Sequence, residues 1–172
     1  KLREMTGVGF KDCKAALDES KGNIEKSIEL LRIKGISKAN KKMERIASDG
    51  LVAIFEEQNK FSIIEVNSET DFVAKNHEFI KFVEEISKLA LSKNGKMEDI
   101  TSAVMGNKKK VKDNLVALIS KIGEKITLRR SAYIGDDNYL NFSYIHSALK
   151  KNVGKIGVIV SLKSKKQKNE LL

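Results

Sequence analysis

The architecture of this chain can be worked out from LVAIFEEQNKFSIIEV, which spans residues 51–66. Residues 51–55 and 61–66 are rich in β-branched and aromatic side chains, which suit the pleated, half-buried environment of a strand. The polar residues 56–60 lie between these runs and have the length of a hairpin loop. The stretch therefore predicts an antiparallel hairpin at the centre of the fold.

Helix and strand patterns follow this hairpin along the chain. Two apolar stripes with a spacing of three or four residues predict helices that bury one face against a sheet. Runs at 126–134, 139–146 and 156–162 predict strands, and Gly-Asp-Asp-Asn at 135–138 predicts a turn. We therefore expect an α+β core built on an antiparallel sheet. The two stripes consist of Phe79, Phe82, Val83, Ile86, Leu89 and Ala90, and of Val111, Leu115, Leu118, Ile119 and Ile122.

A small helical module precedes the hairpin. Apolar residues recur at helical spacing within residues 1–35 and predict three short helices that share one core. Asn23 is a good N-cap, and Gly35 is placed where a helix would end. Residues 36–48 are basic and predict a separate linker helix. We therefore divide the chain into this module (1–35), the linker (36–48), a first core unit (49–135) and a partial second core unit (136–172).

The second hairpin, at 139–162, looks like the start of a repeat of the first unit. After Leu162 the sequence is Lys-rich and polar, so this hairpin has no helix of its own to cover its apolar face. An uncovered apolar face is an aggregation liability or an interface. We infer that the chain is a fragment or that a partner covers this face.

Composition narrows the class of protein. Of the 172 residues, 41% are apolar and 33% are charged, which is compatible with a folded core. The apolar runs are far shorter than the ~20 residues of a membrane span. We therefore expect no membrane partner. The single cysteine, Cys13, excludes a disulfide framework and a cysteine-rich zinc site.

The net charge of +10 is concentrated near the end of the chain. Residues 141–172 contain seven basic residues and one acidic residue. A nucleic-acid surface usually combines Lys and Arg along one face with aromatic side chains for stacking. The terminal lysines have no aromatic partner, so a solvated end is favoured over a nucleic-acid site. These lysines are Lys163, Lys165, Lys166 and Lys168.

The sequence contains no motif for nucleotide binding, metal binding or catalysis. Neither Gly-Lys pair, at 95–96 or at 154–155, has a glycine at the spacing of a phosphate-binding loop. Neither His77 nor His146 has a further ligand at metal-site spacing, and no local arrangement suggests a nucleophile with its base. We therefore expect no enzymatic activity, no cofactor, no metal and no direct nucleotide binding.

Three segments hold residues that local structure rules do not explain. Phe10 follows Thr-Gly-Val-Gly at 6–9 and is either a core residue or a surface anchor for a partner helix. Phe72 lies beside Asp71 between a strand and a helix, and is either a core aromatic or an exposed apolar wedge. His146 ends a strand and, taken alone, is a structural histidine. The residues by themselves leave these alternatives open.

Taken together and in this order, the segments resemble the elongation factor Ts family, the nucleotide exchange factors of the GTPase elongation factor Tu. The resemblance covers nearly the whole chain, and Thr-Asp-Phe-Val after a strand is its specific signal. It is carried by LREMTGVGFKDCKAAL (2–17), GNIEKSIELLRIKG (22–35), EVNSETDFVAKN (65–76), KIGEKITLRR (121–130), and YIH (144–146) followed by KIGVIV (155–160).

The resemblance implies a tip that displaces elements of the GTPase near its nucleotide and Mg²⁺ site. The positions that match this tip are Thr70, Asp71, Phe72 and Val73. It also implies a ubiquitin-associated-like three-helix module at the N-terminus, followed by a core of two related units. We accordingly expect a C-terminally shortened member of the family. The resemblance also implies a location in the bacterial cytoplasm, with an organelle matrix as the alternative.

The resemblance further implies docking contacts away from the tip. The matching positions are Arg3, Phe10 and Lys11 in the helical module and His146 in the second hairpin. On this reading the chain is a guanine nucleotide exchange factor that binds elongation factor Tu and promotes GDP release. The alternatives are a basic RNA-binding protein, and a ubiquitin-associated-like docking module on an unrelated core.

Overall fold

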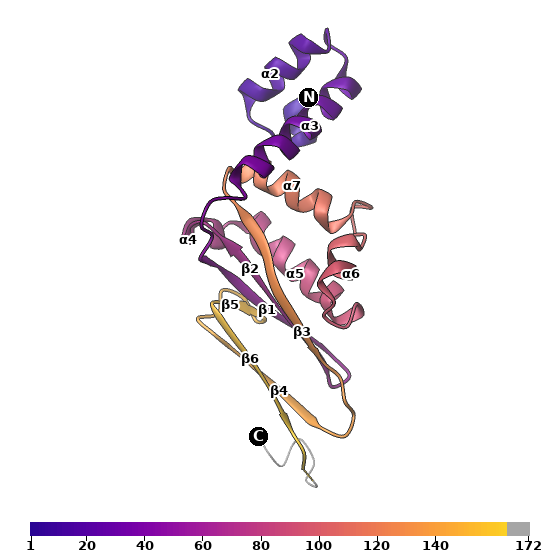
Figure 1. Cartoon of the computed structure of the whole chain (residues 1–172), viewed down its shortest axis with the longest axis vertical. Helices are drawn as coiled ribbons and strands as arrows, with labels where there is room; N and C mark the ends of the chain where they lie inside the picture. Colours follow the sequence, from indigo (N-terminus) through magenta and orange to yellow (C-terminus); the bar gives the residue numbers. More distant parts are fainter. Residues whose placement is uncertain (165–172) are drawn as a thin grey trace.

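The computed structural model describes residues 1–164. The molecule is elongated, with a helical module at one end, a helix-covered sheet in the middle and a two-stranded ribbon at the other end (Figure 1). The expected α+β class with antiparallel pairing is confirmed. The helices are α1 (Leu2–Thr6), α2 (Phe10–Glu19), α3 (Ile24–Lys42), α4 (Asp71–Ala74), α5 (His77–Ser92), α6 (Met97–Ser102) and α7 (Val111–Ile122). The strands are β1 (Asp49–Glu57), β2 (Lys60–Ser68), β3 (Ile126–Ile134), β4 (Leu140–His146), β5 (Val153–Gly154) and β6 (Ile156–Leu162).

The central hairpin is present, but its loop is shorter than predicted. β1 and β2 stay paired as far as Glu57 and Lys60, so only Gln58 and Asn59 turn the chain. Both turn residues have positive φ, 48° and 62°, as in two-residue turns whose twist matches that of the strands. The prediction of a loop over 56–60 was wrong because the strand tips extend into solvent, where polar side chains do not interrupt pairing.

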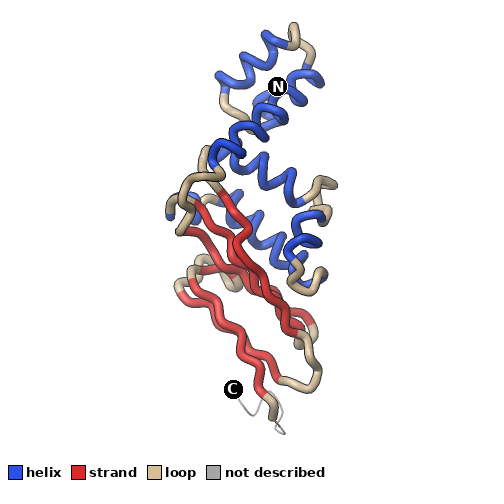
Figure 2. The backbone as a smooth tube through the Cα atoms, viewed as in Figure 1, coloured by secondary structure: helices blue, strands red, loops and turns tan. Residues whose placement is uncertain are grey.

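The main sheet has four strands in the order β3-β2-β1-β5. β3 covers the residues predicted for it, Ile126–Ile134. The two-residue strand β5 was not predicted, because so short a segment carries no periodicity, yet its Val153 is almost fully buried beside β1. Figure 2 shows helices α5, α6 and α7, in blue, on one face of the sheet, and the N-terminal helices beyond its end.

Helix α5 forms the centre of the core because its apolar stripe packs across β1 and β2. Asn76 caps its N-terminus by accepting the N–H groups of the next turn at 2.9 and 3.2 Å. Phe79, Val83 and Ile86 are fully buried, and each contributes about 1.5–3 kcal/mol of hydrophobic stabilisation. The result is a rigid platform on which the segment between β2 and α5 is mounted.

The N-terminal helices α1, α2 and α3 enclose a second, smaller apolar cluster. Its buried members come from all three helices, as the sequence predicted for this module. Asn23 caps α3 through a bond from the N–H of Lys26 to its Oδ1, 2.9 Å long. The buried residues of the cluster are Leu2, Cys13, Ala16 and Leu31.

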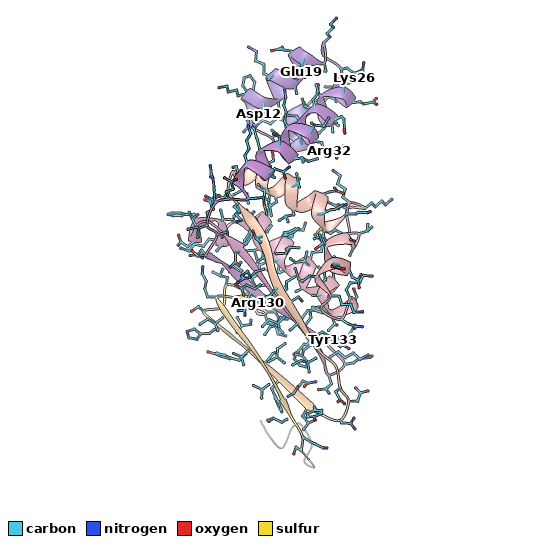
Figure 3. All side chains as sticks on the ribbon, viewed as in Figure 1. Asp12, Glu19, Lys26, Arg32, Arg130 and Tyr133 are labelled. Carbon is cyan, nitrogen blue, oxygen red and sulfur yellow. The ribbon has the colours of Figure 1, made fainter. Side chains whose placement is uncertain are left out.

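Two ion pairs connect α2 with α3 on the outside of this module. Lys38 pairs with Asp12 at 2.7 Å, and Lys34 pairs with Glu19 at 2.6 Å. Asp12 and Glu19 are labelled on α2 in Figure 3. All four side chains are exposed, so each pair contributes at most about 1 kcal/mol. The apolar cluster therefore provides most of the module's stability.

Helix α3 does not end at Gly35, and the separate linker helix predicted at 36–48 is not formed. α3 continues to Lys42, and residues 43–48 form turns and extended chain. Gly35 is buried against α7, where an added Cβ would lie 3.3 Å from the Oγ of Ser120. The glycine thus allows two helices to approach closely and does not act as a helix stop. As a consequence, α3 joins the module to the core as one continuous rod (Figure 1).

Strands β4 and β6 form a separate antiparallel ribbon. Gly157 faces the main sheet, where an added Cβ would meet side chains of Val52 and Ile63. The opposite face is apolar and largely exposed, and no described helix covers it (Figure 1). This outer face consists of Leu140, Phe142, Tyr144, His146, Ile156, Val158, Val160 and Leu162. The absence of a covering helix was predicted for this hairpin, and it holds for the residues that the structure describes.

Two sequence predictions at the ends of this region need comment. β4 begins at Leu140, one residue later than predicted. Lys165, Lys166 and Lys168, which were predicted to belong to a solvated end, lie outside the described residues.

Within residues 1–164, no helix combines the length and the apolarity that a bilayer crossing requires.

Candidate partner-binding site

The segment between β2 and α5 presents an exposed aromatic ring. We call residues 70–73 the tip. The side chain of Phe72 is 77% exposed, whereas the neighbouring Val73 is 4% exposed and Ala74 is fully buried. Because all three lie on the single turn of α4, the buried pair anchors the turn while the ring points into solvent. The residues alone left open whether Phe72 is a core aromatic or an exposed apolar wedge, and in the structure its ring is exposed.

The base of the tip is held by a carboxylate from a distant part of the chain. Glu124, which follows α7, accepts the backbone N–H of Thr70 at 3.0 Å and its hydroxyl at 2.8 Å. The hydroxyl of Ser68 donates to the carbonyl oxygen of Thr70 at 3.0 Å. The N–H, the hydroxyl and the carbonyl of Thr70 are therefore all bonded, which fixes the backbone from which α4 starts.

A second carboxylate makes the reciprocal contact. Glu69 accepts the backbone N–H of Lys125 and pairs with Arg45, whose Nη1 is 3.3 Å away. The N–H of Lys125, followed by Arg45, lowers the pKa of the Glu69 carboxyl. Glu69 is thus held in its charged form beside the tip.

A charged pair flanks the exposed ring. Lys75 donates to Asp71 at 2.7 Å, one helical turn apart, and both side chains are partly exposed. The hydrogen bond with Asp71 raises the pKa of Lys75. The tip therefore offers a partner one apolar ring beside a local ion pair, an arrangement suited to docking.

The sequence-predicted residues of the helical module are also exposed. Phe10 is the first residue of α2 and is 71% exposed, so it is not a core residue. Arg3 and Lys11 lie at the surface on either side of it in sequence. Met5, which the sequence did not single out, is exposed as well at the end of α1. In the sequence, Met5 lies one short connection before Phe10, and this proximity is the signal that could have identified it.

His146 lies at the end of β4 and is exposed on the outer face of the ribbon. Its Nδ1 is 3.1 Å from the hydroxyl oxygen of Tyr144. The histidine therefore has a polar partner from its own strand, but it is not enclosed in a core. It contributes the polar end of an otherwise apolar face.

The structure does not bring these residues into one pocket. The module that carries Phe10, the helix α4 that carries Phe72 and the ribbon that carries His146 follow one another along the length of the molecule (Figure 1). Such an arrangement suits an extended surface that touches a large partner at separate points. A small-molecule site would instead gather its polar groups in one concave place.

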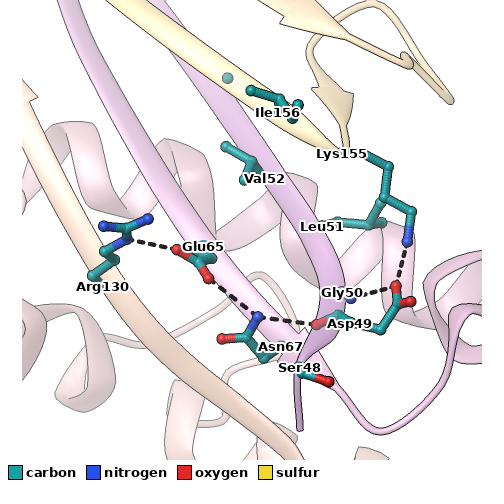
Figure 4. A pocket seen from close by; sticks show the side chains of 11 residues that line it. Ser48, Asp49, Gly50, Leu51, Val52, Glu65, Asn67, Arg130, Lys155 and Ile156 are labelled. Atoms are coloured by element: carbon teal, nitrogen blue, oxygen red, sulfur yellow. Dashed lines mark hydrogen bonds and ion pairs between the residues drawn. The ribbon is translucent and has the colours of Figure 1, made fainter.

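A cleft of about 520 Å³ lies between the main sheet and the start of β6 (Figure 4). Its charged groups neutralise one another, because Glu65 pairs with Arg130 at 2.6 Å and Asp49 pairs with Lys155. The bond from Lys155 lowers the pKa of Asp49. Burial opposes ionisation of Glu65, but the bonds from Arg130 and Asn67 outweigh it and lower the pKa of that carboxyl. Both carboxylates of the cleft thus have lowered pKa values, whereas a general acid at neutral pH has a raised one.

Sequence reasoning did not find the two carboxylates that hold the tip. Glu124 is 54 residues from Thr70 along the chain, and no local pattern connects residues so far apart. The one available signal was the presence of Glu124 in KIGEKITLRR, one of the segments that carries the family resemblance.

Among the described residues, no group of three or more His, Cys, Asp or Glu side chains is arranged to hold a metal ion.

Comparison with known proteins gives one consistent result. Residues 69–172 match the family described as Elongation factor TS. The chain is similar to proteins named Elongation factor Ts from Methylobacterium nodulans (46% identical over 164 residues), Rhizobium etli (44% over 171) and Xanthobacter autotrophicus (46% over 164). The matches cover 95%, 99% and 95% of this chain, and 53%, 56% and 53% of the respective relatives. The chain therefore spans about half the length of the curated relatives it matches.

Proposed function

Because the chain belongs to the elongation factor Ts family, we propose that it is a guanine nucleotide exchange factor that binds the GTPase elongation factor Tu and promotes GDP release during translation elongation. One structural observation supports the proposal independently of family membership. Phe72 is 77% exposed within a turn whose other residues are buried or hydrogen-bonded. A ring in that position costs hydrophobic stabilisation in the free protein, and a partner that covers it recovers that stabilisation.

Exchange requires differential binding and no catalytic group. A GTPase holds GDP through phosphate contacts and a coordinated Mg²⁺. A protein that binds the nucleotide-free state more tightly than the GDP-bound state lowers the affinity for GDP by the same factor.

The tip has the properties of a wedge. Packed helix pairs shift between discrete arrangements and do not deform smoothly. A stiff aromatic ring that enters such a pair near the nucleotide can move one helix by about an ångström, enough to disturb metal and phosphate contacts. We assign insertion to Phe72, its polar flank to Asp71, and its support to Thr70 and Val73.

The remaining exposed residues supply docking in this proposal. The module at 1–35 docks through Arg3, Phe10 and Lys11, and the ribbon contacts another part of the GTPase through His146. The core units at 49–135 and 136–172 hold the tip and the ribbon apart. Because the relatives are bacterial, we place this activity in the bacterial cytoplasm.

The two rival functions have less support. An RNA-binding protein needs a basic surface with neighbouring aromatic side chains, but the exposed aromatics Phe10, Phe72 and Tyr144 lie in separate parts of the molecule (Figure 1). An enzyme that merely carries a docking module would bury Phe72 and use a polar pocket. Instead, the ring is exposed and the charges of the cleft are paired.

A binding experiment tests the proposal directly. The 172-residue chain is mixed with nucleotide-free bacterial elongation factor Tu and analysed by size-exclusion chromatography with and without excess GDP. We expect a complex without nucleotide that dissociates when GDP is added, because GDP and the chain oppose each other's binding. A complex with equal affinity in both conditions would refute the exchange function. A gel shift with tRNA at two salt concentrations tests the RNA-binding alternative.

A further inference from the structure

The contact between Glu124 and Thr70 replaces the ordinary cap of a helix. Thr70 is the N-cap residue of α4, with extended φ and ψ of −129° and 160°, but its side chain makes no cap bond to the helix. An N-cap threonine usually accepts a helix N–H with its own hydroxyl oxygen. Here the hydroxyl donates to Glu124, whose other oxygen accepts the N–H of Thr70. Glu124 therefore fixes the start of α4 from outside the helix.

A helix of this length does not fix its own direction. α4 has four residues, fewer than a helix needs to be stable by itself. Val73 and Ala74 attach its end to the core. Thr70 attaches its beginning to Glu124, and Phe72 lies between these two points. The direction of the ring therefore depends on both attachments.

The attachment at the beginning is reciprocal. Thr70 donates its N–H to the side chain of Glu124, and Lys125 donates its N–H to the side chain of Glu69. Two neighbouring residues of one segment thus exchange side-chain-to-backbone bonds with two neighbouring residues of the other. We call these four residues, Glu69, Thr70, Glu124 and Lys125, the clamp.

The clamp also holds the chain that leaves the N-terminal module. Nζ of Lys125 donates to the carbonyl oxygens of Met43 and Arg45 at 2.6 and 2.8 Å. Nζ of Lys42, the last residue of α3, donates to the carbonyl oxygen of Gly123. The same three-residue connection between α7 and β3 therefore contacts both the tip and the end of α3.

From this geometry we propose that Glu124 is a positioning residue for exchange, which aims the ring of Phe72 at the partner and holds it in one orientation. The inference rests on the proposed function. A ring fixed in its bound direction loses less conformational freedom on binding, so more of its contact energy acts on the partner. Glu124 and Thr70 are only partly buried and belong to neither apolar cluster. Loss of the contact should thus loosen the tip and leave the fold intact.

The orientation of the ring can be measured without a partner. The chain contains no tryptophan, so Phe72→Trp introduces a single indole at the tip, which is excited at a wavelength where the three tyrosines do not absorb. In this background we expect Glu124→Ala to lower the fluorescence anisotropy of the indole, and Glu124→Gln, which keeps one acceptor oxygen, to restore most of it. Glu98→Ala, at an exposed acidic residue of α6, is the matched control. Equal anisotropy in Glu124→Ala and the control would overturn the proposal.

The effect on exchange is measured with Phe72 in place. Stopped-flow release of a fluorescent GDP analogue from elongation factor Tu is followed at increasing concentrations of each variant. For Glu124→Ala we expect the maximal rate to fall about fivefold to tenfold, as for a misplaced reacting group. The half-saturating concentration should stay within about twofold, because docking by the module is intact. A raised half-saturating concentration with an unchanged maximal rate would assign Glu124 to docking and refute the positioning role.

The anisotropy and stopped-flow experiments together distinguish a failure of this proposal from a failure of the proposed function. If the unmodified chain fails to accelerate GDP release, the exchange function is wrong, and the anisotropy still decides whether Glu124 orients the tip. If the unmodified chain accelerates release and Glu124→Ala matches it, exchange stands and the positioning role is wrong.

Discussion

Replacing Phe72 with alanine should separate partner binding from folding. The ring is 77% exposed, so its removal should change the free energy of unfolding by less than about 0.5 kcal/mol. A phenylalanine side chain can bury roughly 200 Å², of which about 150 Å² is then available to a partner. At about 25 cal/mol per Å² this area is worth about 4 kcal/mol, an upper value. Ordering and desolvation reduce it to about 2 kcal/mol, or about thirtyfold in stimulated GDP release.

The assay is stopped-flow release of a fluorescent GDP analogue from elongation factor Tu, with urea denaturation of each variant in parallel. Val104→Ala serves as the control, because Val104 is also a large exposed apolar residue and lies outside the tip. We expect the control to retain the rate and the denaturation midpoint of the unmodified chain. A Phe72→Ala chain that stimulates release as fast as the control would refute the wedge mechanism.

Three further substitutions test the platform beneath the tip. Gly50→Ala should destabilise the fold by more than about 2 kcal/mol in urea denaturation, because Gly50 has a φ of 132° and an added Cβ would collide with a carbonyl oxygen of β2. Asn76→Ala should cost about 1 kcal/mol, seen as a lower melting temperature, because its Oδ1 accepts two N–H groups of α5, and Asn76→Ser should recover most of the loss. Glu69→Gln should reduce the free energy of unfolding near neutral pH. Since the folded-state pKa of Glu69 is lowered, its contribution is present above the ordinary carboxyl pKa and is lost as the pH falls through the folded value. The difference between the two proteins in urea denaturation should therefore shrink below about pH 4, and a constant difference would contradict this reasoning.

The elements that could be predicted from sequence are those that carry a continuous local pattern. Helices α5 and α7 show apolar periodicity because each packs on the same side along its length. Strands β3 and β6 are indicated by their β-branched residues. Asn76 marks the start of α5 with a local signal of this kind, because its side chain accepts an N–H group of the first turn. Burial and capping are local properties that a sequence displays directly.

The sequence predictions that were wrong or incomplete concern features that depend on residues distant in the sequence. Gly35 has the character of a helix stop until α7 is placed against it. The turn at Gln58 and Asn59 is hidden by polar strand ends. For the site, the residues alone left the exposure of Phe10 and Phe72 open, because an aromatic residue at a helix start can equally pack on the following turn. The family resemblance implied exposure, and both rings are exposed. Glu124 was missed because only the folded chain brings it to Thr70.

The continuity of helix α3 has a consequence for how a bound partner would dissociate. Since α3 passes from the N-terminal module to α7 without a break, the spacing between the rings of Phe10 and Phe72 is built into the protein. In the proposed complex, seating one ring confines the other near its own pocket at a high effective concentration. On this proposal two individually weak contacts act as one strong contact, and a nucleotide that expels Phe72 leaves the contact of Phe10 too weak to hold the partner alone.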